Sequence, residues 1–382
     1  MLISKLPNVG TTIFTRMSQL AVETGALNLS QGFPDFDGPQ GLREAVSRHV
    51  AAGHNQYAPM TGLPALREQV AAKIARSYGR SVSADSEITI TPGATQAIFC
   101  AVQALVRPGD EVIVFDPSYD SYEPSVELAG GQCIHVPLAL PGFSIDWQRL
   151  QDALSAKTRL IILNTPHNPS GALISKAELD QLAALIRGRD IYLISDEVYE
   201  HLVFDGVAHV SVLAHDELYQ RAFVVSSFGK SYHVTGWKTG YVVAPPTLSA
   251  ELRKVHQYVS FCGVTPLQWA LADYMAEHPE HVEDLPAFYQ AKRDLFCDLL
   301  GGSRFNFTRA AGTFFQLVDY SAIRPDLDDV AMAEWLTREQ GVAAIPISVF
   351  YQAPPKDLRL VRFCFAKREE TLRQAAEKLC AI

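Results

Sequence analysis

The sequence predicts an α/β protein, with a large domain built on a mostly parallel sheet between helices and a smaller α+β domain after it. Short apolar runs alternate with helical patterns from about residue 86 to residue 270, and several of the runs are apolar throughout. Strands buried on both faces of a parallel sheet have this composition, and their regular exchange with helices is typical of layered α/β domains. The pattern changes near residue 270, which indicates a second domain.

Seven of the runs are candidate strands, so the predicted sheet is seven-stranded. They occupy residues 87–91, 111–116, 133–138, 159–164, 191–195, 222–227 and 240–245. Two helix candidates lie between them, at residues 94–106 and 176–188. The second ends at Gly188, which we expect to cap that helix because glycine readily takes the left-handed conformation found at helix ends.

The last third of the chain predicts the smaller domain. A long helical stretch is followed by a strand pattern at 312–320, a helix around 330–340 and a strand pattern at 358–366. We expect 41–272 to form the large domain and 273–382 the small C-terminal domain. Residues 1–40 are loop-rich and could pack on either of them.

Composition and charge exclude several classes of protein. The chain has 382 residues, of which 48% are hydrophobic, and its formal charge of −9 argues against a nucleic-acid or anionic-membrane surface, because both need clustered Lys and Arg. Six cysteines without a CxxC pair indicate reduced core thiols, and neither a disulfide framework nor a metal site is expected. There is no apolar leader at the N-terminus and no run of membrane-spanning length. We therefore expect a cytoplasmic protein.

Polar residues directly follow five of the candidate strands, and ligands of parallel α/β sheets bind at the carboxyl ends of the strands. These polar segments are residues 91–95, 116–119, 164–169, 196–199 and 226–238. In the first, a glycine precedes a helix, so the amides of Ala94 and Thr95 can point outward as an anion site. A plain strand-to-helix turn would have the same sequence.

Single residues at the other strand ends each allow two interpretations. Asp196 is expected at a buried edge, where a carboxylate needs a cation, although it could instead cap the following segment. Tyr119 could stack on a flat ring or belong to the core. Asn164 and Asn168 flank a rigid proline turn and could be turn residues. Arg362 lies in an apolar strand pattern, where its guanidinium would bind a ligand carboxylate or form a structural salt bridge.

The segment 226–238 contains Lys230 and Lys238 among hydroxyls, glycines and aromatics. Two cations this close repel each other unless an anion lies between them or one of them is uncharged. Gly-Lys-Ser also ends a phosphate-binding P-loop, but that motif needs a glycine where this chain has Val224. A nucleotide hydrolase is therefore disfavoured, and no GxGxxG motif after a strand supports a dinucleotide site.

Together these groups suit pyridoxal phosphate better than a nucleotide. A lysine amine forms a Schiff base with the aldehyde of this cofactor, and a carboxylate keeps its pyridine nitrogen protonated so that the ring can accept electrons. Hydroxyls, a second lysine and a helix N-terminus can neutralise its phosphate. On this interpretation Lys230 bonds the aldehyde, and Lys238 is the counter-ion of the phosphate.

Several motifs, in the same order along essentially the whole chain, resemble the class I aminotransferases of pyridoxal-phosphate fold type I. They are "QGFPDF", "NQYAPMTGLPALREQVA", "TPGATQA", "DPSYDSYEP", "NTPHNPSG", "SDEVYEHLVF", "SSFGKSYHVTGWKTGYVVAPP" and "RLVRFCFAK". Within that family the chain is most similar to the bacterial methionine aminotransferases and next to the kynurenine aminotransferases. The resemblance implies that residues 41–272 bind the cofactor, and that 1–40 packs with the small domain and the active site.

The resemblance also implies roles for individual residues. Lys230 would be the Schiff-base lysine and general acid–base, and Asp196 would pair with the pyridine nitrogen. Tyr199 and Asn168 would bond the phenolic oxygen of the ring, and Tyr119 would stack on it.

The remaining residues that the resemblance implies would bind the phosphate of the cofactor and the amino-acid substrate. The phosphate would be bound by Ala94, Thr95, Ser227, Lys238 and, from the other subunit of a homodimer, Tyr57. The substrate carboxylate would meet Arg362, Asn164 and the backbone of Gly32, and the substrate side chain would meet Phe14, Tyr57 and Phe261. Where many class I enzymes have an arginine at the second phosphate cation, this chain has Lys238, a change that the kynurenine branch shares.

The implied reaction moves the amino group of a large neutral amino acid, methionine first and then phenylalanine or other aromatics, to a 2-oxo acid. A carbon–sulfur β-lyase acting on cystathionine or other cysteine conjugates would use the same parts. A pyridoxal-phosphate-dependent regulator is disfavoured, because only about thirty residues precede "QGFPDF" and they contain no basic helix-turn-helix.

Overall fold

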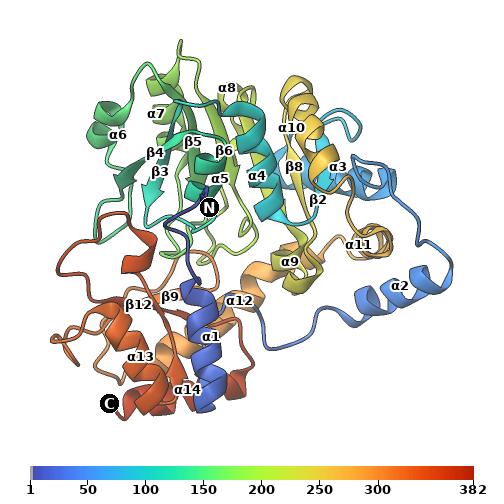
Figure 1. The fold of residues 1–382 in the computed structure, drawn as a ribbon. Coiled ribbons are helices and arrows are strands. Elements are labelled where there is room, and N and C mark those ends of the chain that lie inside the picture. The colour runs from blue at the N-terminus through green and yellow to red at the C-terminus, as the bar shows by residue number, and fades with distance from the viewer. Residues whose placement is uncertain (1–2) are drawn as a thin grey trace.

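The computed structural model describes residues 3–382, and its centre is a seven-stranded sheet (Figure 1). The strand order is β2-β8-β7-β6-β5-β3-β4, and β8 runs in the opposite direction to the other six strands. The strands are β2 (Ile88–Thr91), β3 (Glu111–Asp116), β4 (Gln132–Pro137), β5 (Thr158–Asn164), β6 (Tyr192–Asp196), β7 (Ala222–Ser227) and β8 (Gly240–Val243). All seven predicted strands are in this sheet, which confirms the predicted mostly parallel architecture.

Helices cover both faces of the sheet. One face packs against α4 (Ala94–Leu105), α5 (Tyr122–Leu128) and α10 (Pro246–Val259), as their shared apolar cluster shows. Figure 1 shows these three helices on the viewer's side of the strands. The other helices of this part are α2 (Gln40–Ala51), α3 (Pro64–Tyr78), α6 (Trp147–Ala153), α7 (Lys176–Ile186), α8 (Asp216–Tyr219), α9 (Phe228–Ser231) and α11 (Thr265–Glu277).

The two helices predicted from the sequence are both present. The first is α4, and the second is α7, which ends at Ile186. Its C-cap is Arg187, so Gly188 lies one position beyond the cap, with a φ of 75° that a residue with a side chain rarely adopts. The positive φ expected for Gly188 is therefore present, one residue later than the cap itself.

The C-terminal part is built on a three-stranded antiparallel sheet in the order β11-β12-β9. Its elements are α12 (His281–Leu300), β9 (Phe315–Asp319), α13 (Asp329–Glu339), β10 (Val342–Ala343), β11 (Ile345–Pro346), β12 (Leu360–Cys364) and α14 (Glu369–Cys380). From the start of the chain, α1 (Ile13–Thr24) packs against α13, and β1 (Leu27–Asn28) pairs in parallel with β10. Figure 1 shows α1 beside α13, so the N-terminal segment lies with the C-terminal part.

The expected division at residue 272 falls inside α11. This helix packs against α2 and α3, and its buried Leu271 and Met275 belong to the core that those helices share. The next break in helical structure after residue 272 lies between Glu277 and His281. Within residues 3–382, no helix combines the length and the apolar composition that a membrane span requires.

Candidate active site

A cavity of about 310 Å³ lies at the carboxyl ends of the central strands, bordered also by α1 and β12. Two of the predicted site residues, Tyr57 and Phe261, do not line it. The others all line it: Phe14, Gly32, Ala94, Thr95, Tyr119, Asn164, Asn168, Asp196, Tyr199, Ser227, Lys230, Lys238 and Arg362. The fold thus brings together residues that are as much as 348 positions apart in the sequence, since Phe14 and Arg362 line the same wall.

Tyr57 and Phe261 contact each other away from the cavity. Their rings pack edge to face with centroids 5.6 Å apart, and Tyr57 is 84% exposed. Phe261 is 41% exposed, so neither aromatic side chain is covered by its own chain.

One corner of the cavity has the features of an anion site. Gly93, which has no side chain to cap α4, leaves the amides of Ala94 and Thr95 at the helix N-terminus without a side-chain partner. Lys238 lies against the same corner, because a Cβ atom at Gly93 would lie 3.3 Å from its Nζ. Gly240 allows β8 to approach so closely that a Cβ there would lie 2.9 Å from the amide nitrogen of Ala94. Free amides beside a cation suit a phosphate.

Asp196 ends β6 and is only 4% exposed. Its carboxylate accepts a hydrogen bond from the Tyr122 hydroxyl at 2.7 Å and one from the Val198 amide at 3.3 Å. Among residues 3–382, no Lys, Arg or His forms an ion pair with it. Burial raises the pKa of Asp196 to about 6, against the opposing effect of the two hydrogen bonds. A cationic ligand group at this carboxylate would oppose that shift, because a neighbouring positive charge favours the charged form of the acid.

Lys230 lies in α9, directly after β7, and its Nζ donates to the carbonyl oxygen of Gly32 at 2.8 Å. The amine is also near two aromatic rings, 5.4 Å from the centroid of Tyr199 and 5.0 Å from that of Phe314. Burial lowers the pKa of Lys230 to about 8, and the positive charges of Arg362 and Lys238 lower it further, with Cys364 and Asp196 opposing. A sizeable fraction of this amine is therefore neutral near physiological pH, the form needed for nucleophilic or base chemistry.

Arg362 is 1% exposed, yet no carboxylate within residues 3–382 forms an ion pair with it. Its Nη1 donates to the side-chain oxygen of Asn168 at 2.7 Å, and its Nη2 to the carbonyl oxygen of Ser30 at 3.2 Å. The guanidinium stacks on Phe315, 3.8 Å from the ring centroid, and its buried Nε has no partner in this part of the chain. The structural salt bridge considered from the sequence is therefore wrong, and the group is available to a ligand carboxylate.

The two asparagines connect Asp196 to Arg362. Asn164 donates to the backbone carbonyl of Asp196 at 3.0 Å and accepts the amide of Asn168 at 2.8 Å. Because Asn168 in turn accepts from Arg362, these residues do more than form the proline turn between them.

Comparison with known proteins identifies the family. The family model described as aminotransferase class I and II matches residues 24–379. This chain belongs to that family. It is 57% identical over 376 residues to the methionine aminotransferase of Escherichia coli strain K12, which covers 98% of this chain and 97% of that protein. It is 35% identical to kynurenine–oxoglutarate transaminase 3 of Rattus norvegicus, covering 98% of this chain and 88% of the relative.

A solved structure from Escherichia coli, described as having a methionine aminotransferase function, agrees with this fold. Its TM-score is 0.98 at 55% sequence identity, and the match covers 100% of both chains. The protein is thus an aminotransferase with the fold-type-I architecture expected from its motifs, and its cofactor is pyridoxal 5′-phosphate.

The cavity of this aminotransferase fits that cofactor in three respects. The uncapped N-terminus of α4 and Lys238, which has no ion-pair partner in the described part of the chain, suit the phosphate. Asp196 has a buried carboxylate without a cation among residues 3–382, as a protonated pyridine nitrogen needs. Lys230 supplies a depressed-pKa amine for the aldehyde. The unpaired guanidinium of Arg362 is then left for the carboxylate of an amino acid.

Sequence reasoning missed two side chains that act on the predicted residues. Tyr122 bonds Asp196 and begins α5, three positions after Tyr119, but nothing in the sequence indicates that its hydroxyl turns toward the sheet. Phe315 packs on Arg362 because of the antiparallel pairing of β9 with β12. In that pairing Phe315 is opposite Cys364, and Cys364 and Arg362, two positions apart on β12, point to the same face of the sheet. The lining residues Gln31, Ile98, Val198, Thr235 and Thr239 were also not predicted.

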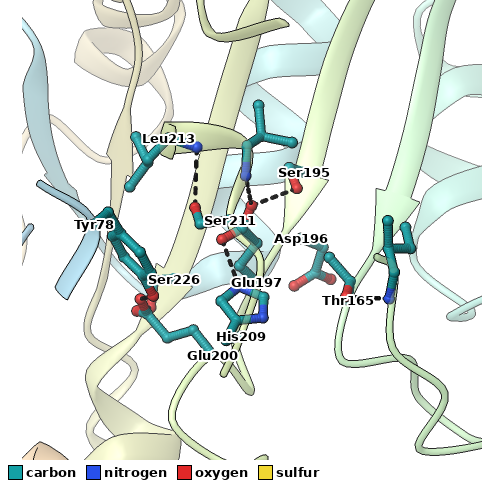
Figure 2. A network of polar contacts seen from close by, with 12 residues as sticks. Tyr78, Thr165, Ser195, Asp196, Glu197, Glu200, His209, Ser211, Leu213 and Ser226 are labelled. Atoms are coloured by element: carbon teal, nitrogen blue, oxygen red, sulfur yellow. Dashed lines mark hydrogen bonds and ion pairs between the residues drawn. The ribbon is translucent and has the colours of Figure 1, made fainter. Parts of the chain in front are cut away.

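Glu200 belongs to a network of buried polar groups near Asp196, and Figure 2 shows it with Tyr78 and Ser226. Glu200, four residues beyond Asp196, forms a 2.5 Å ion pair with Lys73 and accepts hydrogen bonds from the hydroxyls of Tyr78, Ser226 and Tyr241. Burial acts to raise the pKa of Glu200, but the charge and hydrogen bond of Lys73 hold it well below its usual range. This network joins α3 to β7 and β8, the strands on either side of the lysine-bearing segment.

Proposed function

We propose that this aminotransferase takes the amino group of a large uncharged amino acid, methionine first and then phenylalanine or other aromatics, and passes it to a 2-oxo acid. The main support is the substrate end of the cavity, where Arg362 lies among the aromatic rings of Phe14 and Phe315. Among the described residues, Arg362 is the only arginine that lines the cavity, so a side-chain carboxylate has no guanidinium to bind. The name of the Escherichia coli relative points to the same donor.

Each residue of the cavity would then have a defined task. Ala94, Thr95, Ser227 and Lys238 hold the phosphate of the cofactor, and Asp196 keeps a proton on its ring nitrogen. The further contacts are those of Tyr119 with the face of the ring and of Tyr199 and Asn168 with its phenolic oxygen. On the substrate, Arg362, Asn164 and the backbone of Gly32 orient the carboxylate, and Phe14 contacts the side chain.

When bound, pyridoxal phosphate supplies an aldehyde for the amino group and a ring that accepts electrons. Lys230 moves the proton. With the cofactor bound, its neutral amine would take the proton from the substrate Cα and later return a proton, and addition of water would then release the 2-oxo acid. The lowered pKa of Lys230, about 8, suits a group that must both take and return this proton. A second 2-oxo acid then receives the amino group by the same steps in reverse.

We further propose a homodimer in which Tyr57 reaches the phosphate of the partner's site. Tyr57 packs on Phe261, and Tyr258 and Val264, each three positions from Phe261 in the sequence, are 86% and 60% exposed, so this segment presents several large side chains to the surface. Mixing Lys230→Ala subunits with Tyr57→Phe subunits tests the arrangement, because a site shared between chains leaves one hybrid site with neither change. That site should bind cofactor with wild-type affinity. If the only lysine-bearing site is instead weakened about ten- to a hundredfold, as in Tyr57→Phe itself, Tyr57 acts within its own chain.

The domain division and the compartment are also proposals. We propose that the large domain extends through Glu277 and binds the cofactor, and that the small domain follows with the N-terminal segment packed on it. A reducing compartment, the cytoplasm, accords with the six cysteines, all of which are free thiols.

A panel of amino donors against several 2-oxo acids, with the products separated by chromatography, tests the proposed substrate. Methionine should exceed alanine or aspartate at least tenfold in kcat/KM, because burying its side chain is worth about 1.5–3 kcal/mol. Aspartate as the best donor would contradict the proposal. Release of pyruvate from cystathionine without any amino acceptor would favour the β-lyase alternative, for which the relatives described above give no support.

A further inference from the structure

Asp116 ends β3 and is one of the strand-end residues that the cofactor and substrate roles leave unassigned. It is 1% exposed, and its two carboxylate oxygens have different partners. Oδ1 lies 2.8 Å from Nδ1 of His135, on the adjacent strand β4. Oδ2 accepts the backbone amide of Gln352 at 2.9 Å, and Gln352 belongs to the small domain. Asp116 is therefore a buried carboxylate that connects the two domains.

A second bond reinforces this connection. The amide of Ser118 donates to the carbonyl oxygen of Phe350 at 2.7 Å, so the segment after β3 and residues 350–352 are joined at two points. His135 keeps one oxygen of Asp116 occupied, which leaves the other directed at the small domain. Nε2 of His135 lies 3.6 Å from Glu123, so a second acid on the large-domain side faces the same imidazole.

The residues joined in this way belong to a short segment, here named the 347–352 loop, that includes the turn Ser348–Phe350. Its other end is held within the small domain by Asp329, the first residue of α13. One oxygen of Asp329 accepts the amides of Ile347 and Ser348, each at 2.6 Å, and the other accepts the hydroxyl of Ser348 at 2.6 Å. The loop is thus held by one buried carboxylate from each domain.

The 347–352 loop also lies directly behind the substrate end of the cavity. Phe350 is 5% exposed, and its ring packs against Phe14 with centroids 5.7 Å apart. The guanidinium of Arg362 lies 5.8 Å from the centroid of the same ring. Phe350 therefore supports both the residue proposed to contact the substrate side chain and the residue proposed to bind its carboxylate.

We propose that Asp116 is a positioning residue: by binding the Gln352 amide it holds the 347–352 loop on the large domain, and so keeps Phe350 behind Phe14 and Arg362 in the geometry that binds a large apolar amino acid. It touches neither the cofactor nor the substrate, and it acts through the loop. The choice of substrate in the test rests on the proposed function, whereas the attachment of the loop can be measured without it.

Two variants remove the bond from opposite sides in the cofactor-loaded enzyme. The first variant, Asp116→Ala, removes the acceptor. Its matched control is Asp116→Asn, which keeps an oxygen that can still accept the amide of Gln352. Gln352→Pro removes the donor and leaves Asp116 and His135 intact. The preceding Tyr351 has φ −114° and ψ 142°, an extended conformation that a following proline allows. Gln352→Ala, which keeps the amide, is its matched control.

Hydrogen exchange of peptides covering residues 347–351 is the first measurement. Loss of a charge-assisted hydrogen bond should speed exchange there by roughly ten- to a hundredfold in Asp116→Ala and Gln352→Pro. In the same two variants the KM for methionine should rise about tenfold, with kcat changed less than about threefold and cofactor affinity unchanged. Asp116→Asn and Gln352→Ala should stay near the wild type in all three quantities.

Asp110→Ala controls for a general loss of stability. Asp110 precedes the opposite end of β3 and accepts the Arg107 amide at 2.8 Å, so it loses a comparable bond far from the loop. Wild-type exchange and KM in Gln352→Pro would overturn the proposal, and so would faster exchange without a change in KM. If the wild type does not transaminate methionine but exchange at 347–351 still rises, the substrate proposal fails and the attachment of the loop by Asp116 stands.

Discussion

Asp196 and Glu200 lie four residues apart and are both buried, at 4% and 5% exposure, yet the protein surrounds them differently. Glu200 has Lys73 and three hydroxyls, and its pKa lies below the usual range, although burial acts in the opposite direction. Asp196 has a phenol and an amide but no cation, and burial raises its pKa to about 6. Lys73 thus neutralises the carboxylate of Glu200 from within the protein. The carboxylate of Asp196, in the cavity, has no cation beside it in the described part of the chain, and a bound ligand can supply one.

The lysines show the same contrast. Lys73 is paired with Glu200, whereas Lys230 has no acid at ion-pair distance among the described residues and shares the cavity with the equally unpaired Arg362 and Lys238. Uncompensated buried charge is costly in the absence of a ligand. Lys230 and Arg362 carry such charge in one cavity, with the exposed Lys238 beside them, and this is the strongest sign in this structure that an anionic, multiply charged ligand binds there.

The largest effect should come from Lys230→Ala, which removes the group that bonds the aldehyde and moves the proton. Turnover should fall by about 10⁴-fold or more, while the fold is retained. Borohydride reduction of the wild type followed by peptide mapping should label Lys230. Label on Lys238 would reverse the assignment of the two lysines.

Breaking the ion pair between Lys73 and Glu200 should instead destabilise the folded protein. Lys73→Met leaves Glu200 buried without its cation, which should lower the free energy of unfolding by about 3–5 kcal/mol in urea titrations. The double variant Lys73→Met/Glu200→Gln should recover most of this loss. Lys230→Met is the contrasting control, since its unpaired amine should cost the cofactor-free protein little or nothing. If the free energy of unfolding of Lys73→Met falls by less than about 1 kcal/mol, the ion pair is not what distinguishes the surroundings of Glu200 from the cavity.

Asp196→Asn should reduce kcat by about 100- to 1,000-fold, because an amide cannot hold a proton on the ring nitrogen. Cofactor affinity should change much less, since the phosphate contacts remain. Steady-state kinetics together with a cofactor titration separate these two quantities. Near-normal transamination by the variant would mean that this carboxylate has another task.

The pH dependence of cofactor-free stability should also reveal Asp196. Because its folded-state pKa, about 6, lies above the ordinary value of 3.8, the folded protein holds this proton more tightly than the unfolded chain does. The resulting stabilisation is present at low pH and is lost as pH rises through 6, by roughly 2 kcal/mol between pH 4.5 and 7. The wild type should show this loss relative to Asp196→Asn in urea titrations at both pH values. Equal pH dependence in the two proteins would contradict it.

The smallest expected effect is that of Tyr122→Phe, which removes the 2.7 Å hydrogen bond to Asp196 and keeps the ring. A bond to a charged acceptor is worth about 1.5 kcal/mol or somewhat more, so kcat should fall about tenfold. Tyr78→Phe, which removes a hydroxyl from Glu200, is the matched change in the paired network and should leave kcat unaltered. If kcat falls equally in Tyr122→Phe and Tyr78→Phe, the hydroxyl that bonds Asp196 is no more important for catalysis than the one that bonds Glu200.

The strands and most of the cavity were predictable, because apolar runs identify buried strands and parallel strands place their last residues at one edge. Asp196, Asn164 and Tyr119 follow from that rule directly. The roles of single residues depended on the resemblance to a family. Where the sequence left two interpretations of Arg362, only the structure decided between them, because no acid within residues 3–382 forms an ion pair with it and its buried Nε has no partner there.

Features made by side-chain direction or by long-range packing could not be predicted. Tyr122 reaches Asp196 only because α5 crosses the sheet in one particular orientation, and the bond from Asp116 to Gln352 joins residues 236 positions apart. The change in pattern near residue 270 falls inside a helix, and the packing of α11 on α2 and α3, which the sequence does not reveal, is the reason why we propose a later domain division.

The pairing of β1 with β10 has a consequence for how the chain is made. Leu27 is opposite Val342, so the segment around β1 must wait for a partner that is synthesised 315 residues later. At roughly 5–20 residues per second, that delay is about 15–60 s. During this time the apolar face of α1, with Met17 and Leu20, lacks α13, the helix that it packs against in the folded protein. We therefore expect chaperones to bind α1 preferentially until α13 has been synthesised.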